Sequence, residues 1–216
     1  MADMRIVIAG GHGKIALRLA ARLRGGAVGL VRNPAHVSGV EAAGAEAVLC
    51  DLERAGVEEV ARVVEGADAV VFAAGAGPGS GALRKDTVDR GASVLLADAA
   101  ERAGVRRFVQ ISSMGAGKPV EPGRDEVWAA YIRAKTAAED DLRRRDLDWT
   151  ILRPGRLTDE PGTGLVRLAP EVPPGPVPRD DVAAVIVALL AEPAAVRATF
   201  ELVAGDTPIG ELFARR

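Results

Sequence analysis

The sequence is poor in cysteine and in aromatic residues. Cys50 is the single cysteine among 216 residues, and aromatic residues make up 3% of the chain. One cysteine forms neither an internal disulfide nor a multi-cysteine metal site, so we expect no bound metal. Tyr131 is the only tyrosine.

An excess charge of one sign and a long hydrophobic run are also missing. The 28 Lys and Arg residues oppose 30 Asp and Glu residues, a net charge of −2. Nucleic-acid binders usually carry a basic excess, so we expect no nucleic-acid partner. The best apolar run, 182–191, is shorter than the ~18 to 20 residues that span a bilayer. The apolar run 6–9 is too short for a signal-peptide core. We therefore predict a cytoplasmic protein with no membrane partner.

Glycine, in contrast, is abundant, with 25 residues in 216 against an average of roughly 7%. Some of these glycines, such as Gly44, Gly66 and Gly104, follow predicted helices and are expected to end them. Others follow predicted strands, where a missing side chain lets the backbone approach a ligand closely. Hydrophobic residues make up 48% of the chain, enough for a sizeable core in one domain.

The first 113 residues alternate between short β-branched runs and segments of helical period. Such alternation predicts βαβ units and a parallel sheet covered by helices on both faces. The expected strands are 5–9, 27–31, 47–49, 69–73 and 108–111, and the expected helices are 15–23, 34–43, 57–64 and 88–103.

The second half continues the pattern less regularly. Asp125 is expected to cap a helix running to about Arg145, and Asp180 or Asp181 to open a helix ending at Ala191. Further strands are expected at 149–152, 164–168 and 199–203, with a final short helix at 209–214. The predicted fold is α/β: a Rossmann-type doubly wound parallel sheet with a small C-terminal extension.

The turn after the first strand has the spacing Gly10-x-x-Gly13-x-x-Ala16. A phosphate-binding turn needs a tight bend, a residue without a side chain near the pyrophosphate, and a small residue where helix meets strand. The N–H groups and dipole of the following helix then hold the phosphates. The alternative is an ordinary strand–helix turn, but the place of the motif in a βαβ unit favours dinucleotide binding.

The end of the second strand indicates which dinucleotide is bound. NAD sites usually carry Asp or Glu there, whereas this chain has Arg32, and the first acid downstream is Glu41. Arginine pairs bidentately with a 2′-phosphate. We therefore predict NADP(H) in preference to NAD(H), the alternative being a solvated loop arginine. His12 and Lys14 are expected to add nearby charge, although His12 is equally compatible with an exposed loop residue.

Two further strand ends belong to the same predicted site. Asp51, followed by Leu52, is positioned either to reach the adenine amino group or to cap the next helix. The small residues at 73–75 would let backbone pass close to a ribose. The glycine-rich loop 75–81 is compatible with a cover over the cofactor or with a plain linker.

Tyr131 and Lys135 carry the strongest chemical signal. Their i, i+4 spacing places them on one face of a helix, where an ammonium lowers the pKa of a phenol. A tyrosine tuned in this way exchanges a proton with a carbonyl or alcohol during hydride transfer. Ser112 and Ser113 end the fifth strand, at the sheet edge where ligands bind. Taken alone, the tyrosine–lysine pair is a common coincidence and the two serines are compatible with a turn cap.

These segments together resemble the atypical short-chain dehydrogenase/reductase group that contains NmrA-like and biliverdin-reductase-B-like NAD(P)-binding proteins. The resemblance covers nearly the whole chain, although members often lack the tyrosine that is kept here. It is carried by IVIAGGHGKIA (6–16), GLVRNP (29–34), AAGAG (73–77), VRRFVQISSMGA (105–116), YIRAK (131–135), TILRPGRLTDEPGTG (150–164) and PRDDVA (178–183).

The resemblance implies a set of site residues. Ser113 would orient the substrate, Tyr131 would be the acid/base and Lys135 its partner. Arg153 would lie beside the nicotinamide, or else bond a strand-end carbonyl, and Arg179 and Asp181 are expected to form a structural pair. The predicted cofactor-binding residues are Gly10, Gly11, His12, Gly13, Lys14, Ile15, Arg32, Asp51, Leu52, Ala73, Ala74, Gly75, Ile111, Ser112, Lys135, Arg153, Pro154 and Gly155.

The functional hypothesis is an NADPH-dependent oxidoreductase that reduces a small carbonyl, quinone or flavin-like acceptor. The alternative is a non-catalytic NADP(H)-binding redox sensor. A nucleotide-sugar epimerase or dehydratase is disfavoured, because few residues follow the sixth strand and because of Arg32. We expect one domain over 1–216, with 154–178 and 199–216 forming its substrate-side portion, as a monomer or homodimer. The substrate pocket is expected between loops 75–86, 115–125 and 155–178.

Overall fold

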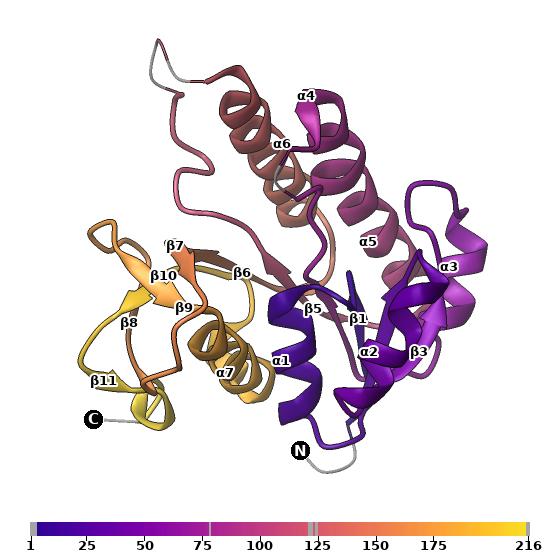
Figure 1. The fold of residues 1–216 in the computed structure, drawn as a ribbon, viewed down its shortest axis with the longest axis horizontal. Coiled ribbons are helices and arrows are strands. Elements are labelled where there is room, and N and C mark those ends of the chain that lie inside the picture. Colours follow the sequence, from indigo (N-terminus) through magenta and orange to yellow (C-terminus); the bar gives the residue numbers. More distant parts are fainter. Residues whose placement is uncertain (1–3, 78, 121–122, 124, 215–216) are drawn as a thin grey trace.

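The computed structural model describes residues 4–77, 79–120, 123 and 125–214 (Figure 1). Most of its strands belong to one nine-stranded sheet, and two short strands pair separately. The strands are β1 (Ile6–Ala9), β2 (Ala27–Val31), β3 (Glu46–Leu49), β4 (Ala69–Phe72), β5 (Arg107–Ile111), β6 (Asp148–Pro154), β7 (Arg156–Thr158), β8 (Leu165–Ala169), β9 (Pro176–Pro178), β10 (Ala198–Ala204) and β11 (Thr207–Pro208).

The large sheet has the order β11-β8-β10-β6-β5-β4-β1-β2-β3. Neighbouring strands pair in parallel from β3, at one edge of the sheet, as far as β10. At the other edge, β8 pairs antiparallel with both β10 and β11. The order reverses between β1 and β4, which is the topological switch point where doubly wound sheets bind ligands. The predicted Rossmann-type sheet is therefore confirmed.

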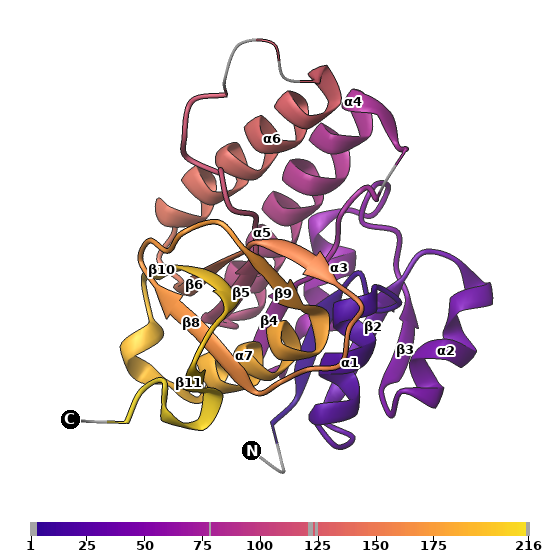
Figure 2. The same ribbon diagram turned by 60° about the vertical axis from the view of Figure 1, so that its left-hand side comes forward.

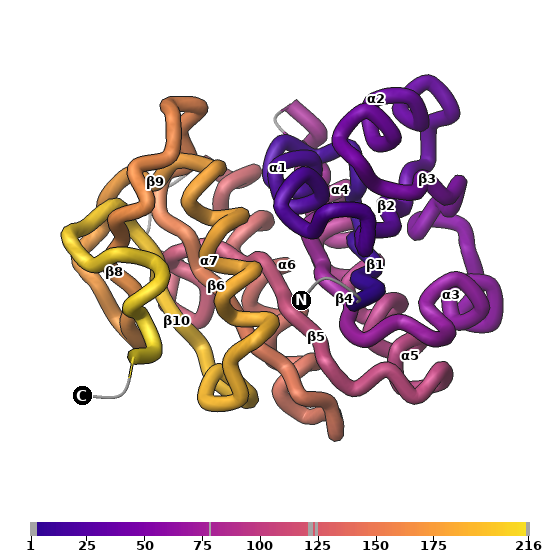
Figure 3. Tube along the Cα trace, turned by 90° about the horizontal axis from the view of Figure 1, so that it is seen from below, coloured from indigo at the N-terminus to yellow at the C-terminus, as the bar shows by residue number. Residues whose placement is uncertain are grey.

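Helices cover both faces of this sheet. Figure 3 shows α1 and α2 on one side of the strands and α3 and α5 on the other. The helices are α1 (Lys14–Arg22), α2 (Val37–Ala42), α3 (Val57–Val64), α4 (Gly81–Arg84), α5 (Ala92–Ala103), α6 (Glu126–Arg143) and α7 (Arg179–Ala191), with short 3₁₀ turns at Pro34–His36, Pro193–Ala195 and Ile209–Glu211 and a π-helical segment at Lys85–Gly91.

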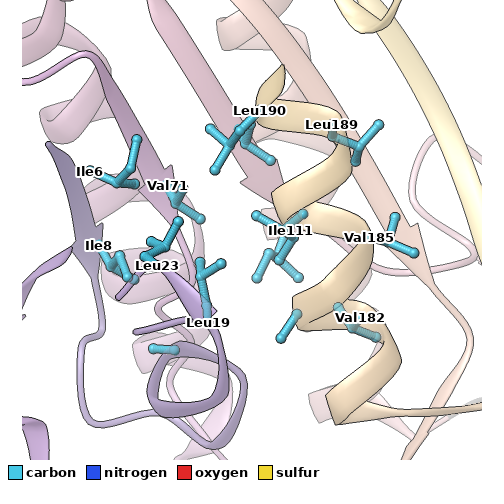
Figure 4. Close-up of a cluster of buried hydrophobic side chains, with 14 of the residues drawn as sticks. Ile6, Ile8, Leu19, Leu23, Val71, Ile111, Val182, Val185, Leu189 and Leu190 are labelled. Carbon is cyan, nitrogen blue, oxygen red and sulfur yellow. The ribbon is translucent and has the colours of Figure 1, made fainter. Parts of the chain in front are cut away.

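Strand alternation divides the core into two layers. Ile6 and Ile8 of β1 point to the layer that contains Leu19 of α1 and Val185 of α7 (Figure 4). Val7 and Ala9 point to the opposite layer, built mainly by α3 and α5. This two-sided burial explains why the strands are apolar throughout rather than alternating. Figure 2 shows α5 and α6 running beside each other.

Three local predictions need correction. The chain is helical from Gly81, because α4 and the π-helical segment precede α5, so 81–86 is not a loop and the helix expected at 88–103 starts earlier. The helix expected at 209–214 is one 3₁₀ turn, Ile209–Glu211, since Pro208 and Gly210 are poor helix formers. The Pro/Gly-rich stretch also contains β7 and β9, a parallel pair whose prolines hide it from strand patterns.

In the described part of the chain, no helix has the length and apolarity needed to cross a membrane.

Candidate cofactor and substrate sites

The turn between β1 and α1 depends on glycine at successive positions. Gly10 has φ +78°, and a Cβ built there would lie 2.7 Å from Ala74 Cα. A Cβ on Gly11 would lie 2.6 Å from Gly29 Cα on the neighbouring strand. The Gly13 N–H donates to the Gly10 carbonyl at 2.8 Å and closes the bend. The turn therefore lies so close to β2 and to the residues after β4 that a side chain at Gly10 or Gly11 would clash with their backbone.

The same turn leaves a surface that suits a pyrophosphate. Gly13 is the N-cap of α1 and makes no side-chain cap, so the first N–H groups of the helix have no side-chain acceptor there. A side chain on Gly13 would crowd the turn itself, because its Cβ would lie 3.0 Å from the Gly10 carbonyl oxygen. Bare N–H groups and a positive dipole favour a bound phosphate. The residues present therefore fit a dinucleotide.

A pocket of about 280 Å³ adjoins the glycine turn and the ends of β2, β3 and β4; we call it the adenosine pocket. Arg32, Asp51 and Leu52, which the sequence places near the adenosine part of the cofactor, all line this pocket. Its wall also holds Glu53 and Arg84, which the sequence did not suggest.

Glu53 connects the two arginines of this pocket. Its carboxylate accepts from Arg32 Nη1 at 2.8 Å and from Arg84 Nη2 at 2.5 Å, and Thr87 Oγ1 donates to it at 3.0 Å. The hydrogen bond from Arg84 is the largest cause that lowers the pKa of Glu53. The Glu53 carboxylate thus pairs with Arg32, the side chain predicted to bind a 2′-phosphate.

His12 and Lys14, the other basic residues predicted to add charge at this turn, have different surroundings. His12 stacks on His36 with ring centroids 3.9 Å apart, and both rings line the adenosine pocket. Lys14 instead pairs with Asp159, at 2.5 Å, in a cluster that also holds Arg179 at 3.0 Å. The structure thus places His12 at the pocket and ties Lys14 to the segment after β7.

Asp51 makes a local turn at the pocket floor. Its Oδ1 accepts from the Glu53 N–H at 3.1 Å. The alternative that it caps the next helix is wrong, because Gly56 is the N-cap of α3. Cys50, beside it in the pocket wall, is buried, and burial raises the pKa of its thiol to about 11, helped by the charges of Glu59 and Asp51.

A second cavity, of about 960 Å³, lies at the ends of β4, β5 and β6; we call it the substrate cavity. Ser113, Tyr131 and Lys135 all line it, together with Ser112. Among the predicted cofactor residues, its walls include Ile15, Ala73, Ala74, Gly75, Ile111, Pro154 and Gly155. The two cavities share the residues at 73–75, so a dinucleotide can extend from one to the other.

Lys135 is buried at the bottom of the substrate cavity. Its Nζ lies 3.2 Å from Asp89 Oδ1 and donates to the Ile111 carbonyl at 3.2 Å. Tyr131 lies on the same helix face, with its ring centroid 5.8 Å from that Nζ. The lysine is therefore near the tyrosine ring, but its charge is shared with a buried carboxylate that the sequence did not reveal.

Ser112 and Arg153 meet at a second unpredicted carboxylate, Glu139. Ser112 Oγ donates to Glu139 at 2.6 Å, and Arg153 donates through Nε at 2.9 Å and Nη2 at 2.5 Å. Burial raises the pKa of Glu139, but the hydrogen bonds from Arg153 and Ser112 outweigh it and hold the pKa below its usual value. Arg153 thus bonds a carboxylate rather than a strand-end carbonyl, while its neighbours Pro154 and Gly155 line the cavity.

Ser113 is the serine available to a ligand. Its Oγ makes a long contact, 3.3 Å, to the Met114 carbonyl, whereas the Ser112 hydroxyl is committed to Glu139. The expected pairing of Arg179 with Asp181 is wrong. Arg179 pairs with Asp159, and Asp181 accepts hydrogen bonds from the backbone N–H groups of Thr163 and Gly164. The pocket borders at 75–86 and 155–178 are present, but the 115–125 loop contributes Asp125 alone among its described residues.

Comparison with known proteins agrees with this geometry. A family model described as NAD(P)H-binding matches residues 10–193. A Bacillus subtilis (strain 168) protein named as an uncharacterized sugar epimerase, YhfK, is 36% identical over 212 residues, covering 96% of this chain and 98% of its own.

Solved structures are similar over the same length. A Bacillus halodurans protein provisionally described as an NAD-dependent epimerase/dehydratase is 35% identical with a TM-score of 0.89, covering 97% of this chain and 98% of its own. ChuY, an anaerobillin reductase from Escherichia coli O157:H7, is 25% identical with a TM-score of 0.77, covering 94% and 98%.

Proposed function

Since the chain belongs to the NAD(P)H-binding family of atypical short-chain dehydrogenases/reductases, we propose that it is an NADPH-dependent oxidoreductase. Its acceptor would be a carbonyl, quinone or flavin-like compound. One observation carries the proposal: Ser113, Tyr131 and Lys135 line a cavity that shares the wall residues 73–75 with the pocket beside the glycine turn.

Each side chain has a role in the proposal that follows from its position. NADPH, when bound, supplies a hydride. Gly10 and Gly13 would hold its pyrophosphate at the start of α1. Ser113 would donate a hydrogen bond to the acceptor oxygen, and Tyr131 would give that oxygen a proton. The ammonium of Lys135, buried beneath Tyr131, would favour the phenolate left after proton transfer.

The preference for NADPH over NADH depends on Arg32. Replacing Arg32 with Ala is expected to weaken NADPH binding by about 10- to 100-fold, the range for lost hydrogen bonds to a charged group. NADH has no 2′-phosphate, so its Kd should stay nearly unchanged. Fluorescence titration of both dinucleotides measures the ratio of the two Kd values. Equal affinities in the wild type would show that Arg32 does not bind a 2′-phosphate.

Glu53 provides the matched variant. It competes with a 2′-phosphate for Arg32 and Arg84, so Glu53→Gln is expected to tighten NADPH binding while leaving NADH binding nearly unchanged. If the Glu53→Gln protein binds NADPH more weakly, the carboxylate orients the arginines instead of competing for them.

The proposed reaction is tested by following NADPH oxidation with a panel of carbonyls, quinones and flavins. Turnover of at least one class is expected. Tight NADPH binding without oxidation by any class would favour the redox sensor. Cytoplasmic location, the state as monomer or homodimer, and the substrate-side portion at 154–178 and 199–216 stay predictions.

A sugar epimerase is the second candidate, because the Bacillus subtilis relative carries that name. An epimerase returns the hydride to the sugar it came from, so no net NADPH oxidation accompanies turnover. Incubation with nucleotide sugars, followed by chromatography of the products, distinguishes the two. Conversion of a nucleotide sugar without dinucleotide consumption would replace the reductase assignment.

A further inference from the structure

Lys85 is a buried cation in the wall of the substrate cavity. Lys85 is the first residue of the π-helical segment, and it is 8% exposed. Its Nζ donates to the Gly77 carbonyl at 2.8 Å and lies 5.4 Å from the centroid of the Tyr131 ring. Both partners are neutral, and an ammonium is costly to bury without an anion.

Two of the other cations around the cavity already have a carboxylate partner: Lys135 pairs with Asp89, and Arg179 pairs with Asp159. Asp89 pairs with Lys135 at 3.2 Å, so it does not neutralise Lys85. Asp125 accepts the Trp128 N–H at 3.0 Å as the N-cap of α6. Of the described lining residues, four are cations and two are carboxylates: Lys85, Lys135, Arg156 and Arg179 against Asp89 and Asp125. With Lys135 paired to Asp89 and Arg179 to Asp159, Lys85 and Arg156 remain against Asp125 among the described lining residues, so the cavity has a small excess of positive charge before a ligand enters.

We propose that Lys85 binds an anionic group, a carboxylate or phosphate, of the hydride acceptor. This inference rests on the proposed oxidoreductase function and names the class of acceptor. The ammonium is beside the ring of Tyr131, so an acceptor anchored at Lys85 would be held within reach of the tyrosine.

The other residues of the cavity wall indicate what the rest of the acceptor is like. Met114, Trp128 and Leu157 line the cavity, and the Trp128 ring lies 5.4 Å from that of Tyr131. Trp128 is 42% exposed, so it presents an aromatic face at the surface. A ligand of this cavity is therefore a flat or apolar acceptor with one anionic substituent.

A phosphate of the cofactor is the other possible source of the anion. The glycine turn already supplies N–H groups for the pyrophosphate, and Arg32 and Arg84 line the adenosine pocket. Lys85 lines only the substrate cavity among the described pockets. Measuring NADPH affinity alongside acceptor affinity separates the two sources.

The test uses acceptor pairs that differ only in the anionic group: FMN with riboflavin, and a naphthoquinone with and without a carboxylate. Binding to the NADP⁺-loaded protein and steady-state KM are measured for wild type, Lys85→Met and Lys85→Arg. In the wild type, the charged member of at least one pair should bind more tightly. Lys85→Met should weaken its binding about tenfold or more, and Lys85→Arg should retain it.

Three control readouts make the result decisive. In Lys85→Met, binding of the uncharged member and of NADPH should stay within about twofold, and the thermal midpoint should not fall, because a buried cation has been removed. Equal loss for both members of a pair, or no preference in the wild type, would overturn the proposal. Weaker NADPH binding would assign Lys85 to the cofactor.

The two proposals fail in different ways. Charge-dependent binding that requires Lys85, without oxidation of NADPH, would retain the anion site and reject the reductase. Oxidation of NADPH with no preference for charged acceptors in binding or KM would retain the reductase and reject the anion site.

Discussion

Replacing Tyr131 with Phe is expected to lower kcat for carbonyl reduction by about 100- to 10,000-fold, the usual contribution of a positioned acid. The substitution removes one hydroxyl and keeps the ring near the ammonium groups of Lys85 and Lys135. The Kd for NADPH should therefore stay nearly unchanged. Steady-state kinetics with a carbonyl acceptor, together with dinucleotide titration, measure both quantities.

Trp128 supplies the matched control for this experiment. It lies on the same helix, its ring is 5.4 Å from that of Tyr131, and it has no acid/base function. Because Trp128 lines the cavity, Trp128→Phe is expected to change KM for the acceptor, while kcat for carbonyls should stay nearly unchanged. Quinones and flavins need less help from a protein acid, so their reduction should survive Tyr131→Phe. Undiminished carbonyl turnover in Tyr131→Phe would show that the proton comes from elsewhere.

The second large effect is expected at Glu139, whose side chain is 0% exposed. Its carboxylate accepts from Ser112 and Arg153, and from Arg143 Nη2 at 2.7 Å. Glu139→Ala should lower the free energy of unfolding by about 3 to 5 kcal/mol, because it leaves the partly buried Arg153 without its anion. Chemical denaturation at neutral pH measures this loss.

The pH dependence of this effect has a definite sign. The folded pKa of Glu139 is below the ordinary value of 4.5, so its ionised form stabilises the folded state above that pH. This contribution is lost as pH falls through the folded pKa. The stability difference between wild type and Glu139→Gln should be greatest near neutral pH and shrink in acid. A difference that is independent of pH would mean that the carboxylate charge contributes nothing.

Hydrophobic periodicity was sufficient for the main elements of the sheet. The strand at 27–31 and the helix at 57–64 have the predicted bounds, because their apolar residues follow one face or fill a two-sided layer. The π-helical segment Lys85–Gly91 was predicted helical only from residue 88, because the glycine-rich stretch 75–86 was expected to be a loop. The pair β7 and β9 was missed because strands of three residues, with Pro176 and Pro178, leave no alternation to detect.

The candidate site divides along similar lines. Spacing on one helix placed Tyr131 and Lys135 together, and the same i, i+4 row continues to Glu139, so its position was readable although its partners were not. Partners distant in sequence had no signal. Glu53 meets Arg32 across 21 residues, and Asp89 meets Lys135 from another helical segment. Such pairs depend on tertiary packing, which no local pattern encodes.

The central claim is that this protein transfers a hydride from NADPH to an acceptor in the cavity that holds Tyr131. NADPH carrying deuterium at its transferable position tests it most directly. After incubation with each acceptor, mass spectrometry of the products should find deuterium in a reduced carbonyl, and Tyr131→Phe should suppress that product. Deuterium retained in the dinucleotide with every acceptor class, despite saturating NADPH binding, would contradict the account.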